Sequence, residues 1–445
     1  MRGPVEVGLL VIGGGAAGMS AASWARRKDP GLSILVLEAT RLVSHAPCGI
    51  PYFVGGLFDD PKLLQAYDAG FFRERRRIEV MTETRVVEVD VGGRWAVAEG
   101  PEGALKVEFD RLVVATGARP RRLREVEGDR VLYAHHPADA CALRSRLSAA
   151  SSVTVVGGGV LGVELAEQLA RLGKRVTLVH RGPYLMSRDF DRDLGEMVTR
   201  QLESLGVRVL LGASAASSRE GGSVVRLDDG REVSSDVTVV AAGVEPNADL
   251  VAGQLPLGPH GAVLVDDRME AGRGGVFAAG DVAEHRNVVT GEPDWRPLAP
   301  IANKMGLVAG VNAAGGDLRF PGVVGDLVTR VGGVLYGRVG LTEAEAARRG
   351  LRYVVGAATI KSRARYYPGG GDVYVKLVAE EATGRIVGGE VAGPEEVVGR
   401  LGIIAAAVMK RMTAEDLFFV EIGYHPSAGR AWDPVVLAAR QLLRV

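Results

Sequence analysis

The sequence has few cysteines, no long apolar run and no excess of charge of either sign, and each shortage excludes a class of protein. Cys48 and Cys141 are the two cysteines in 445 residues, which excludes a disulfide framework and fits a reducing, cytoplasmic setting. No apolar run approaches the roughly 20 residues that cross a bilayer, so LGIIAAAVM (401–409) is expected to be a core helix. Because 54 basic side chains balance 54 acidic ones, we expect neither a nucleic-acid partner nor a membrane partner.

Glycine is abundant, and it forms the same motif twice. The strand-like run Val7–Ile12 leads into Gly13, Gly15 and Gly18, and a second strand, LSILVLE, ends in Glu38, 20 positions after Gly18. In this G-x-G-x-x-G pattern the glycines let a pyrophosphate approach the backbone at a helix N-terminus, and the acid binds ribose hydroxyls. The segment therefore predicts a dinucleotide site.

The second copy of the motif ends in a base instead of an acid. It follows the strand Val153–Val156, and its glycines are Gly157, Gly159 and Gly162. His180 and Arg181 stand where the acid would be, an arrangement that accommodates a ribose 2′-phosphate and so favours NADPH over NADH. The alternative is that Arg181 is a solvated charge at a strand end.

Two unlike nucleotide sites indicate two nucleotides, one of which we expect to be a bound flavin. Segments 110–120, with Gly117, and 236–247 each predict a strand that runs into a glycine turn. GGVFAAGDVAE (274–284) predicts a strand ending at Asp281, an acid suited to a polyol, and PLAPIANKMGLVAG predicts a helix that starts near Ala299.

The order of these motifs resembles, over essentially the whole chain, the pyridine nucleotide-disulfide oxidoreductases. Three short segments, SHAPCGIPY, RYYPGG and GYHPSAGRAWDP, are similar to the coenzyme A disulfide reductase branch, which also contains NAD(P)H oxidases and archaeal sulfur reductases. The resemblance implies bound FAD, NADPH or NADH as donor, and a homodimer completed by the C-terminal third. It assigns FAD contacts to Gly13, Gly15, Gly18, Glu38, Gly117, Asp281 and Ala299. It places Glu164 near the nicotinamide.

Cys48 is predicted to be a redox cysteine that works alone. Dithiol members of the superfamily have two cysteines separated by four residues, but Val43 and Phe53 occupy both corresponding positions here. Cys141 has no catalytic signature and is read as structural. Cys48 would then hold its oxidised state as a mixed disulfide with a small thiol, as a persulfide or as a sulfenic acid.

The neighbours of Cys48 suit that chemistry. Gly49 is expected to allow an unusual backbone angle, and Pro51 is tolerated in the first turn of a helix. Cys48 would then lie at a helix N-terminus, where a thiolate is favoured.

The resemblance also implies groups that serve the substrate. Tyr424 and one of Tyr366 and Tyr367, from the partner subunit, would protonate the leaving thiolate, with interface packing as the alternative. His425 is a second candidate acid. Coenzyme A, as substrate or mixed-disulfide partner, would contact Arg27 and Ser44.

The expected fold is α/β, with two Rossmann-like dinucleotide-binding domains and a C-terminal α+β dimerisation domain that includes a helix over 395–412. The FAD domain is expected to span residues 1–115 and 246–324, the NAD(P) domain residues 116–245, and the dimerisation domain residues 325–445. The expected function is reduction of coenzyme A disulfide, persulfide, polysulfide or sulfur. The alternatives are an NAD(P)H oxidase that reduces O2 through a Cys48 sulfenate and a slowly cycling redox sensor. No metal site is expected.

Overall fold

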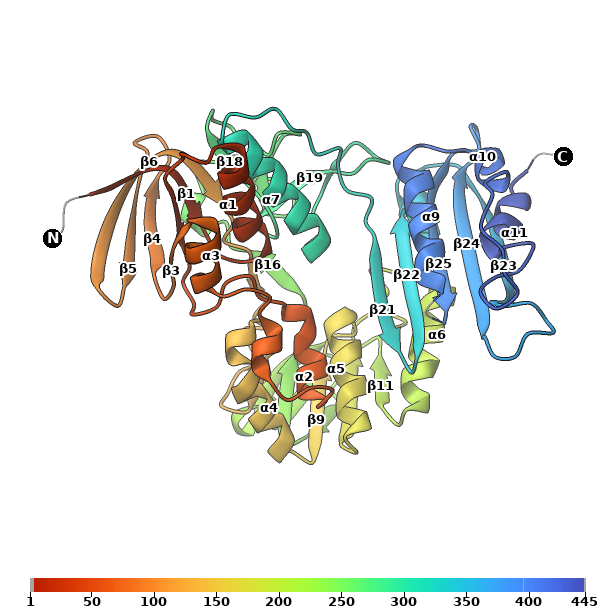
Figure 1. Ribbon diagram of the computed structural model, residues 1–445. Coiled ribbons are helices and arrows are strands. Elements are labelled where there is room, and N and C mark those ends of the chain that lie inside the picture. Colours follow the sequence, from red (N-terminus) through yellow and green to blue (C-terminus); the bar gives the residue numbers. More distant parts are fainter. Residues whose placement is uncertain (1–3, 395, 444–445) are drawn as a thin grey trace.

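The computed structural model describes residues 4–394 and 396–443, which form three bodies, each built on its own sheet (Figure 1). The N-terminal domain lies at upper left in that view, the middle domain at lower centre and the C-terminal domain at right. Two parallel-stranded units and one antiparallel unit confirm the expected α/β class. The domain boundaries remain predictions, and their parts at residues 1–3, 395 and 444–445 lie outside the described residues.

The N-terminal domain combines two stretches of the chain in one sheet. Its strand order is β3-β2-β1-β6-β5-β4, and β18, from the second stretch, pairs with β6. The strands are β1 (Val5–Ile12), β2 (Ile34–Leu37), β3 (Glu79–Met81), β4 (Arg85–Asp90), β5 (Trp95–Gly100), β6 (Gly103–Val114) and β18 (Val276–Ala278). The helices of this part are α1 (Ala16–Lys28), α3 (Ala69–Arg76) and α7 (Ala299–Ala313), with a small sheet of β17 (Val263–Leu264), β19 (Ala283–Arg286) and β20 (Pro293–Asp294). Helix α2 (Ile50–Val54) comes from the first stretch of the chain but packs on the middle domain (Figure 1).

Glycines in α7 hold the two stretches together. A Cβ at Gly306 would lie 2.2 Å from the carbonyl oxygen of Ala17, and one at Gly310 would lie 2.1 Å from that of Ala21. Helix α1 therefore packs on α7 almost backbone to backbone, which larger residues would prevent.

The middle domain contains the second parallel sheet, of order β11-β10-β9-β15-β8. Its strands are β8 (Val131–Tyr133), β9 (Ser152–Val156), β10 (Arg175–His180), β11 (Arg208–Leu211) and β15 (Val237–Val240), and its helices are α4 (Ala140–Ala149), α5 (Val160–Arg171) and α6 (Arg192–Ser204). A three-stranded sheet of β12 (Ala215–Arg219), β13 (Val224–Leu227) and β14 (Glu232–Ser234) flanks it.

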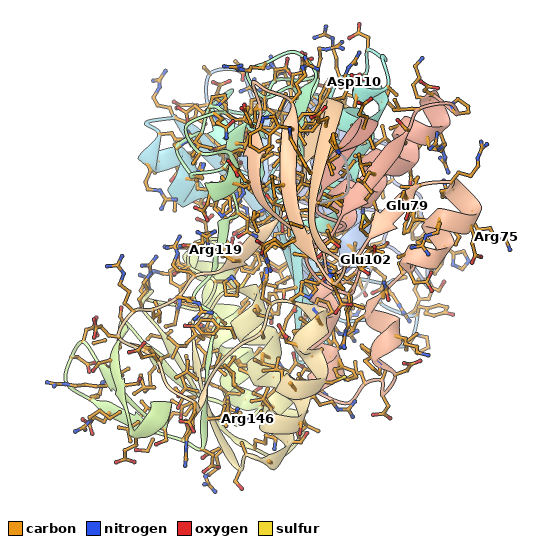
Figure 2. The ribbon with its side chains drawn as sticks, turned by 90° about the vertical axis from the view of Figure 1, so that its left-hand side faces the viewer. Arg75, Glu79, Glu102, Asp110, Arg119 and Arg146 are labelled. Atoms are coloured by element: carbon orange, nitrogen blue, oxygen red, sulfur yellow. The ribbon has the colours of Figure 1, made fainter. Side chains whose placement is uncertain are left out.

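Two short antiparallel strands, β7 (Ala118–Pro120) and β16 (Val244–Pro246), connect the N-terminal and middle domains. Arg119 on β7 pairs with Glu245 at 2.9 Å and donates to the side chain of Asn247 at 3.1 Å. Figure 2 shows Arg119 at the junction of the upper N-terminal domain and the lower middle domain. These contacts tie the outgoing and returning chain together.

The C-terminal domain is an antiparallel sheet of order β21-β22-β25-β24-β23 with helices packed on it. Its strands are β21 (Leu327–Val331), β22 (Val334–Gly340), β23 (Tyr353–Lys361), β24 (Asp372–Glu380) and β25 (Ile386–Gly393), and its helices are α8 (Glu343–Arg348), α9 (Val397–Met409), α10 (Ala414–Phe418) and α11 (Pro434–Arg440). The expected helix over 395–412 is α9. Residue 395 lies outside the described part, and a turn with Arg411 at φ 55° follows the helix.

A buried lysine attaches the C-terminal domain to the middle domain. Lys376 is 2% exposed, and its Nζ donates to Asp191 and Asp193, both at 2.9 Å. Glu390 also pairs with Lys376, at 2.7 Å. A buried cation paired with several carboxylates is costly to separate, so this network fixes the docking of the two domains.

Within the described residues, no helix combines the length and the hydropathy that a membrane crossing requires.

Candidate active site

A cavity of about 1930 Å³ runs between the N-terminal and middle domains and reaches the start of the C-terminal domain. Thirteen of the predicted site residues line it: Gly13, Gly15, Glu38, Ser44, Cys48, Gly117, Gly157, Gly159, Glu164, His180, Arg181, Asp281 and Ala299. The cavity therefore joins both glycine turns to Cys48. The predicted residues outside its wall are Gly18, Gly162, Arg27, Tyr366, Tyr367 and Tyr424.

The glycines of the first turn have different tasks. Gly13 has φ +104°, and a Cβ there would lie 2.1 Å from the carbonyl oxygen of Ala115. A Cβ at Gly18 would lie 1.9 Å from the Gly13 oxygen, so these two glycines allow close packing of α1 on the sheet. Gly15 faces the cavity, since the nearest atom to a Cβ there is 3.8 Å away. The open backbone at Gly15 fits a phosphate.

Glu38 follows β2 directly and braces the first turn. Its Oε2 accepts the Gly14 N–H at 2.7 Å, and its Oε1 accepts the Thr40 N–H at 2.7 Å. The side chain is buried yet lines the cavity. Its carboxylate is therefore held in one orientation at the end of the strand.

The second turn repeats this construction. Gly157 has φ +117° and would place a Cβ 2.3 Å from the carbonyl oxygen of Ala241, while a Cβ at Gly162 would lie 1.8 Å from the Gly157 oxygen. A Cβ at Gly159 would meet no atom within 4 Å. The wall at Gly159 is thus as open to a phosphate as the wall at Gly15.

His180 ends β10 and braces this turn as a neutral ring. Its Nδ1 accepts the Gly158 N–H at 3.2 Å, and its Nε2 lies 3.1 Å from Ser187 Oγ. Burial and the neighbouring Arg181 lower the pKa of His180. Arg181 itself is exposed at the cavity wall. The cationic character of this end therefore comes from Arg181.

Asp281 reaches the cavity from a turn, which corrects the expectation of a strand ending at this residue. Strand β18 ends at Ala278, and Gly280 follows with φ +79°. A Cβ at Gly280 would lie 2.7 Å from Cβ of Ala17, so this turn requires glycine. Burial raises the pKa of the Asp281 carboxyl to about 6. Ala299, the first residue of α7, lines the same wall.

Cys48 is exposed in a 3-10 turn (Pro47–Gly49) directly before α2. The expected unusual backbone angle at Gly49 is wrong, since its φ is −80° and its ψ is −13°. Gly49 is needed for space, because a Cβ there would lie 2.5 Å from Leu64 Cδ2. The left-handed residue of the segment is Ser44, with φ 50°.

The sequence interpretation missed two side chains beside this segment. Thr329 Oγ1 donates to Glu164 Oε1 at 2.9 Å, and Tyr52 also forms a side-chain hydrogen bond with Glu164. Burial raises the pKa of Glu164 to about 7. The spacing of Tyr52, four residues after Cys48, was the available signal for it. No local signal marks Thr329.

A pair of histidines in the cavity wall was also missed. His45 Nε2 and His136 Nε2 lie 3.2 Å apart, and the His136 Nδ1 accepts the Ala138 N–H at 3.1 Å. Burial lowers the pKa of His45 to about 4, so both rings are neutral near pH 7.

The predicted tyrosines gather on the C-terminal domain, away from the cavity. The hydroxyls of Tyr366 and Tyr424 lie 3.4 Å apart, and these side chains are 76% and 51% exposed. His425 is next to them in sequence, with its Nδ1 2.8 Å from Ser427 Oγ. One subunit therefore does not bring these groups to its own Cys48.

Two other predicted residues also lie apart from the cavity. Arg27 stacks on Trp24 at 4.5 Å near the end of α1, and Cys141 is exposed on α4. Across the described residues no cluster of three or more metal-ligating side chains occurs.

Comparisons with known proteins give the same assignment over most of the chain. The family described as "Pyridine nucleotide-disulphide oxidoreductase" matches residues 8–306, and its dimerisation domain matches residues 331–435. The chain is 40% identical over 444 residues to the NAD(P)H coenzyme A polysulfide/persulfide reductase of Pyrococcus horikoshii, with 98% of each chain covered. It is 39% identical over 447 residues to the CoA-dependent NAD(P)H sulfur oxidoreductase of Pyrococcus abyssi, with the same coverage.

A solved structure described as an NAD-dependent persulfide reductase from A. fulgidus is similar with a TM-score of 0.94 and 32% identity. That match covers 98% of this chain and 82% of the other. The chain belongs to the pyridine nucleotide-disulphide oxidoreductase family, an assignment that implies FAD and NAD(P)H as its cofactors.

Proposed function

We propose that this protein is an FAD-dependent NAD(P)H oxidoreductase that reduces coenzyme A disulfide, or the related persulfides and polysulfides, through Cys48. The observation that carries the proposal is the single exposed cysteine in the cavity shared by both glycine turns. Cys141, the other cysteine of the sequence, is not part of that wall. Electrons that pass through this cavity therefore meet one protein thiol.

The residues of the cavity fit the two cofactors. The open backbone at Gly15 and Gly159 suits a pyrophosphate, and Glu38 and Asp281 supply carboxyl groups for the ribose and ribityl hydroxyls of FAD. When bound, FAD supplies two-electron transfer from the nicotinamide to sulfur. Gly117 and the start of α7 at Ala299 complete the proposed flavin contacts.

The covalent chemistry belongs to Cys48. Its thiolate attacks one sulfur of coenzyme A disulfide, so a Cys48–coenzyme A disulfide forms, the substrate S–S bond breaks, and one coenzyme A leaves as a thiolate that takes up a proton. Two electrons and one proton then break the mixed disulfide, releasing the second coenzyme A as a thiol and restoring the Cys48 thiolate. With a coenzyme A persulfide, attack on the inner sulfur forms the same mixed disulfide and releases hydrosulfide; with a polysulfide the leaving group is a shortened sulfur chain.

Tyr366 and Tyr424 are the proposed proton donors for the leaving thiolate. The hydrogen bond with Tyr424 raises the pKa of Tyr366, which keeps that hydroxyl protonated. Because the pair lies outside the cavity of its own subunit, the proposal requires a homodimer in which it reaches the partner's site. The match to a dimerisation domain supports this arrangement. Tyr367 remains the alternative to Tyr366, and His425 the alternative acid.

The cavity offers a wall for the nucleotide part of coenzyme A. Tyr67 and Phe71 stack at 4.3 Å, Arg76 lies 5.8 Å from the Phe71 ring, and all three line the cavity together with Ser44. Aromatic faces suit adenine, and the guanidinium suits phosphate. In this proposal Ser44 lies at the thiol end, and Arg27 contributes from the outer surface of α1.

Arg181 is the proposed determinant of a preference for NADPH. A structural relative of 25% identity is described as an engineered water-forming NADPH oxidase, whose substitutions include aspartate to alanine and alanine to arginine. This chain has a neutral histidine and an arginine at the end of β10. The persulfide reductase from A. fulgidus is described as NAD-dependent, so the preference needs a direct measurement.

An oxidase is the second candidate, because the chain is 32% identical over 456 residues to an NADH oxidase of Methanocaldococcus jannaschii. The test that separates the two is the mass of the non-reduced, denatured protein before and after thiol reduction. Loss of one coenzyme A from Cys48 supports the reductase, and a singly oxygenated cysteine supports the oxidase.

Anaerobic turnover completes the test. Cys48→Ser is expected to retain FAD and to lose reduction of coenzyme A disulfide, whereas the matched control Cys141→Ser is expected to keep both. Undiminished reduction by Cys48→Ser would overturn the proposed chemistry. Poor turnover of the wild-type protein with every disulfide tested would favour a redox sensor.

A further inference from the structure

One carboxyl group in the cavity wall is held by hydroxyls from two distant segments of the chain. Glu164 belongs to α5 of the middle domain, and its Oε1 accepts the hydroxyl of Thr329, on β21 of the C-terminal domain, at 2.9 Å. Tyr52, on α2, which comes from the first stretch of the chain and packs on α5, forms the second side-chain hydrogen bond to the same carboxyl. Glu164 thus joins three segments that are far apart in the sequence, one of them from the C-terminal domain.

A second contact fixes β21 against α5. The N–H of Gly332, in the turn after β21, donates to Glu167 Oε1 at 3.1 Å, and Glu167 is 4% exposed. Arg171 donates to the same oxygen at 2.8 Å. Because two carboxylates one helical turn apart are both held by the β21 segment, Thr329 has little freedom to leave Glu164. Thr329 itself is 2% exposed.

The third contact leads to the redox cysteine. Tyr52 lies four residues after Cys48, one helical turn along, and α2 packs on α5. Burial, together with the charge of the hydrogen-bonded Glu164, raises the pKa of Tyr52, so its hydroxyl stays protonated and donates. The segment that carries Cys48 is therefore connected through Tyr52 to Glu164.

We propose that Tyr52 and Thr329 are positioning residues that keep the Glu164 carboxyl ionised and aimed at the nicotinamide, so that the C-terminal domain takes part in hydride donation. This inference rests on the proposed function and on the family resemblance, which implies that Glu164 lies near the nicotinamide. A nicotinamide gains positive charge when it gives up hydride, and an adjacent carboxylate stabilises that charge. The carboxylate therefore favours the oxidised nucleotide over the reduced one.

The balance of forces on Glu164 makes the two hydroxyls necessary. Burial and the negative charge of Glu167 raise the pKa of Glu164 to about 7, and the hydrogen bonds from Thr329 and Tyr52 oppose that rise. The titratable groups that act on it are Tyr52 from α2 and Glu167 on its own helix, with Cys48 acting on Tyr52. Removing either hydroxyl should shift ionisation of Glu164 to higher pH.

The test uses the FAD-loaded protein and three threonine variants. Thr329→Val removes the hydroxyl at nearly constant shape, Thr329→Ser retains it, and Thr238→Val is the matched control. Thr238 is also fully buried and donates a hydrogen bond, to the Gly222 carbonyl oxygen at 2.7 Å, but it lies outside the cavity wall. Tyr52→Phe tests the other hydroxyl.

Two quantities are measured between about pH 6 and pH 9, a range that includes the pKa of Glu164. The first is the affinity for NADP⁺, by calorimetry. The second is the rate at which NADPH bleaches the flavin absorbance in a rapid-mixing experiment without any sulfur acceptor. Thr329→Val and Tyr52→Phe are expected to weaken NADP⁺ binding at pH 7 by roughly threefold to tenfold and to move the pH dependence of bleaching upward.

Thr329→Ser and Thr238→Val are expected to follow the wild type in both measurements. An unshifted pH dependence and unchanged NADP⁺ affinity in Thr329→Val would overturn the inference, and so would an equal shift in Thr329→Ser. Failure of NADPH to bleach the wild-type flavin would instead overturn the proposed function itself. The two failures are therefore distinguishable.

Discussion

In both Rossmann-like domains, the side chain at the end of the second strand accepts a hydrogen bond from the middle glycine of the turn. In the N-terminal domain the acceptor is Glu38, 2.7 Å from the Gly14 nitrogen. In the middle domain it is His180, 3.2 Å from the Gly158 nitrogen. The backbone contact is the same, but the charge left facing the nucleotide is opposite, because Glu38 is a carboxylate and Arg181 follows the neutral His180.

The comparison separates two tasks that a motif search treats as one. Bracing the turn needs an acceptor, which either a carboxylate or a neutral imidazole provides. Selecting a nucleotide needs a charge, and at the second turn Arg181, the next residue, is its proposed source. The four predictions that follow test this separation.

The largest effect is expected within each turn. Gly13→Ala and Gly157→Ala place a Cβ within 2.3 Å of a carbonyl oxygen at a positive φ and should destabilise folding by about 3 kcal/mol or more. Gly15→Ala and Gly159→Ala, whose Cβ positions are open, should unfold at the wild-type temperature and only weaken nucleotide binding. Thermal unfolding of the four variants is the measurement. If all four variants unfolded at the same temperature, both turns would be able to shift and accommodate the added Cβ without loss of stability.

The next effect concerns FAD. Glu38→Gln keeps an acceptor for the turn but removes the charge that holds two N–H groups and the proposed ribose hydroxyls. We expect FAD to bind about 10-fold to 100-fold more weakly, measured as flavin retained per protein during dilution. The control is Glu79→Gln, an exposed carboxylate on the adjacent β3 (Figure 2). Full retention by Glu38→Gln would mean that bracing, and not charge, is what FAD requires.

A smaller effect is expected at the second turn. Arg181→Glu leaves the His180 contact intact and reverses the charge beside it, so the ratio of kcat/KM for NADPH to that for NADH should fall on the order of tenfold. Arg175→Glu, at the start of the same strand, is the control. An unchanged ratio would remove Arg181 as the determinant.

The smallest effect is a pH dependence of stability. Burial and Arg181 lower the pKa of His180 below its ordinary 6.5, so the folded protein binds fewer protons here than the unfolded chain does. The neutral ring therefore contributes stability above pH 6.5, and this contribution is lost as pH falls. His180→Gln should lose less stability than the wild type between pH 7 and pH 5, by about 1 kcal/mol at most, measured by denaturant unfolding. An identical loss in both proteins would contradict a neutral His180.

The local elements of the site could be predicted from the sequence because the glycine motif is a local pattern. The strands before Gly13 and Gly157, the helices after them and the position of Glu38 all occur as expected. Gly49 was misread because a glycine serves either an unusual angle or a close approach, and the approach of Leu64 is a tertiary fact. The strand expected to end at Asp281 stops at Ala278, and the chain turns at Gly280, which lies against Ala17 of α1. Ala17 is more than 260 residues away in the sequence, so the residues near Asp281 give no sign of this contact.

The sequence by itself determined the two nucleotide turns, the difference in charge between them and the lack of a second cysteine near Cys48. Each of these features depends on residues within about 30 positions of one another. Only the tertiary structure decided which side chains share the cavity. Thr329 lies 165 residues from Glu164, and the tyrosines predicted for catalysis lie outside the cavity of their own chain. Such contacts form when packed domains bury polar groups that must find partners, and this requirement is met in space and not along the sequence.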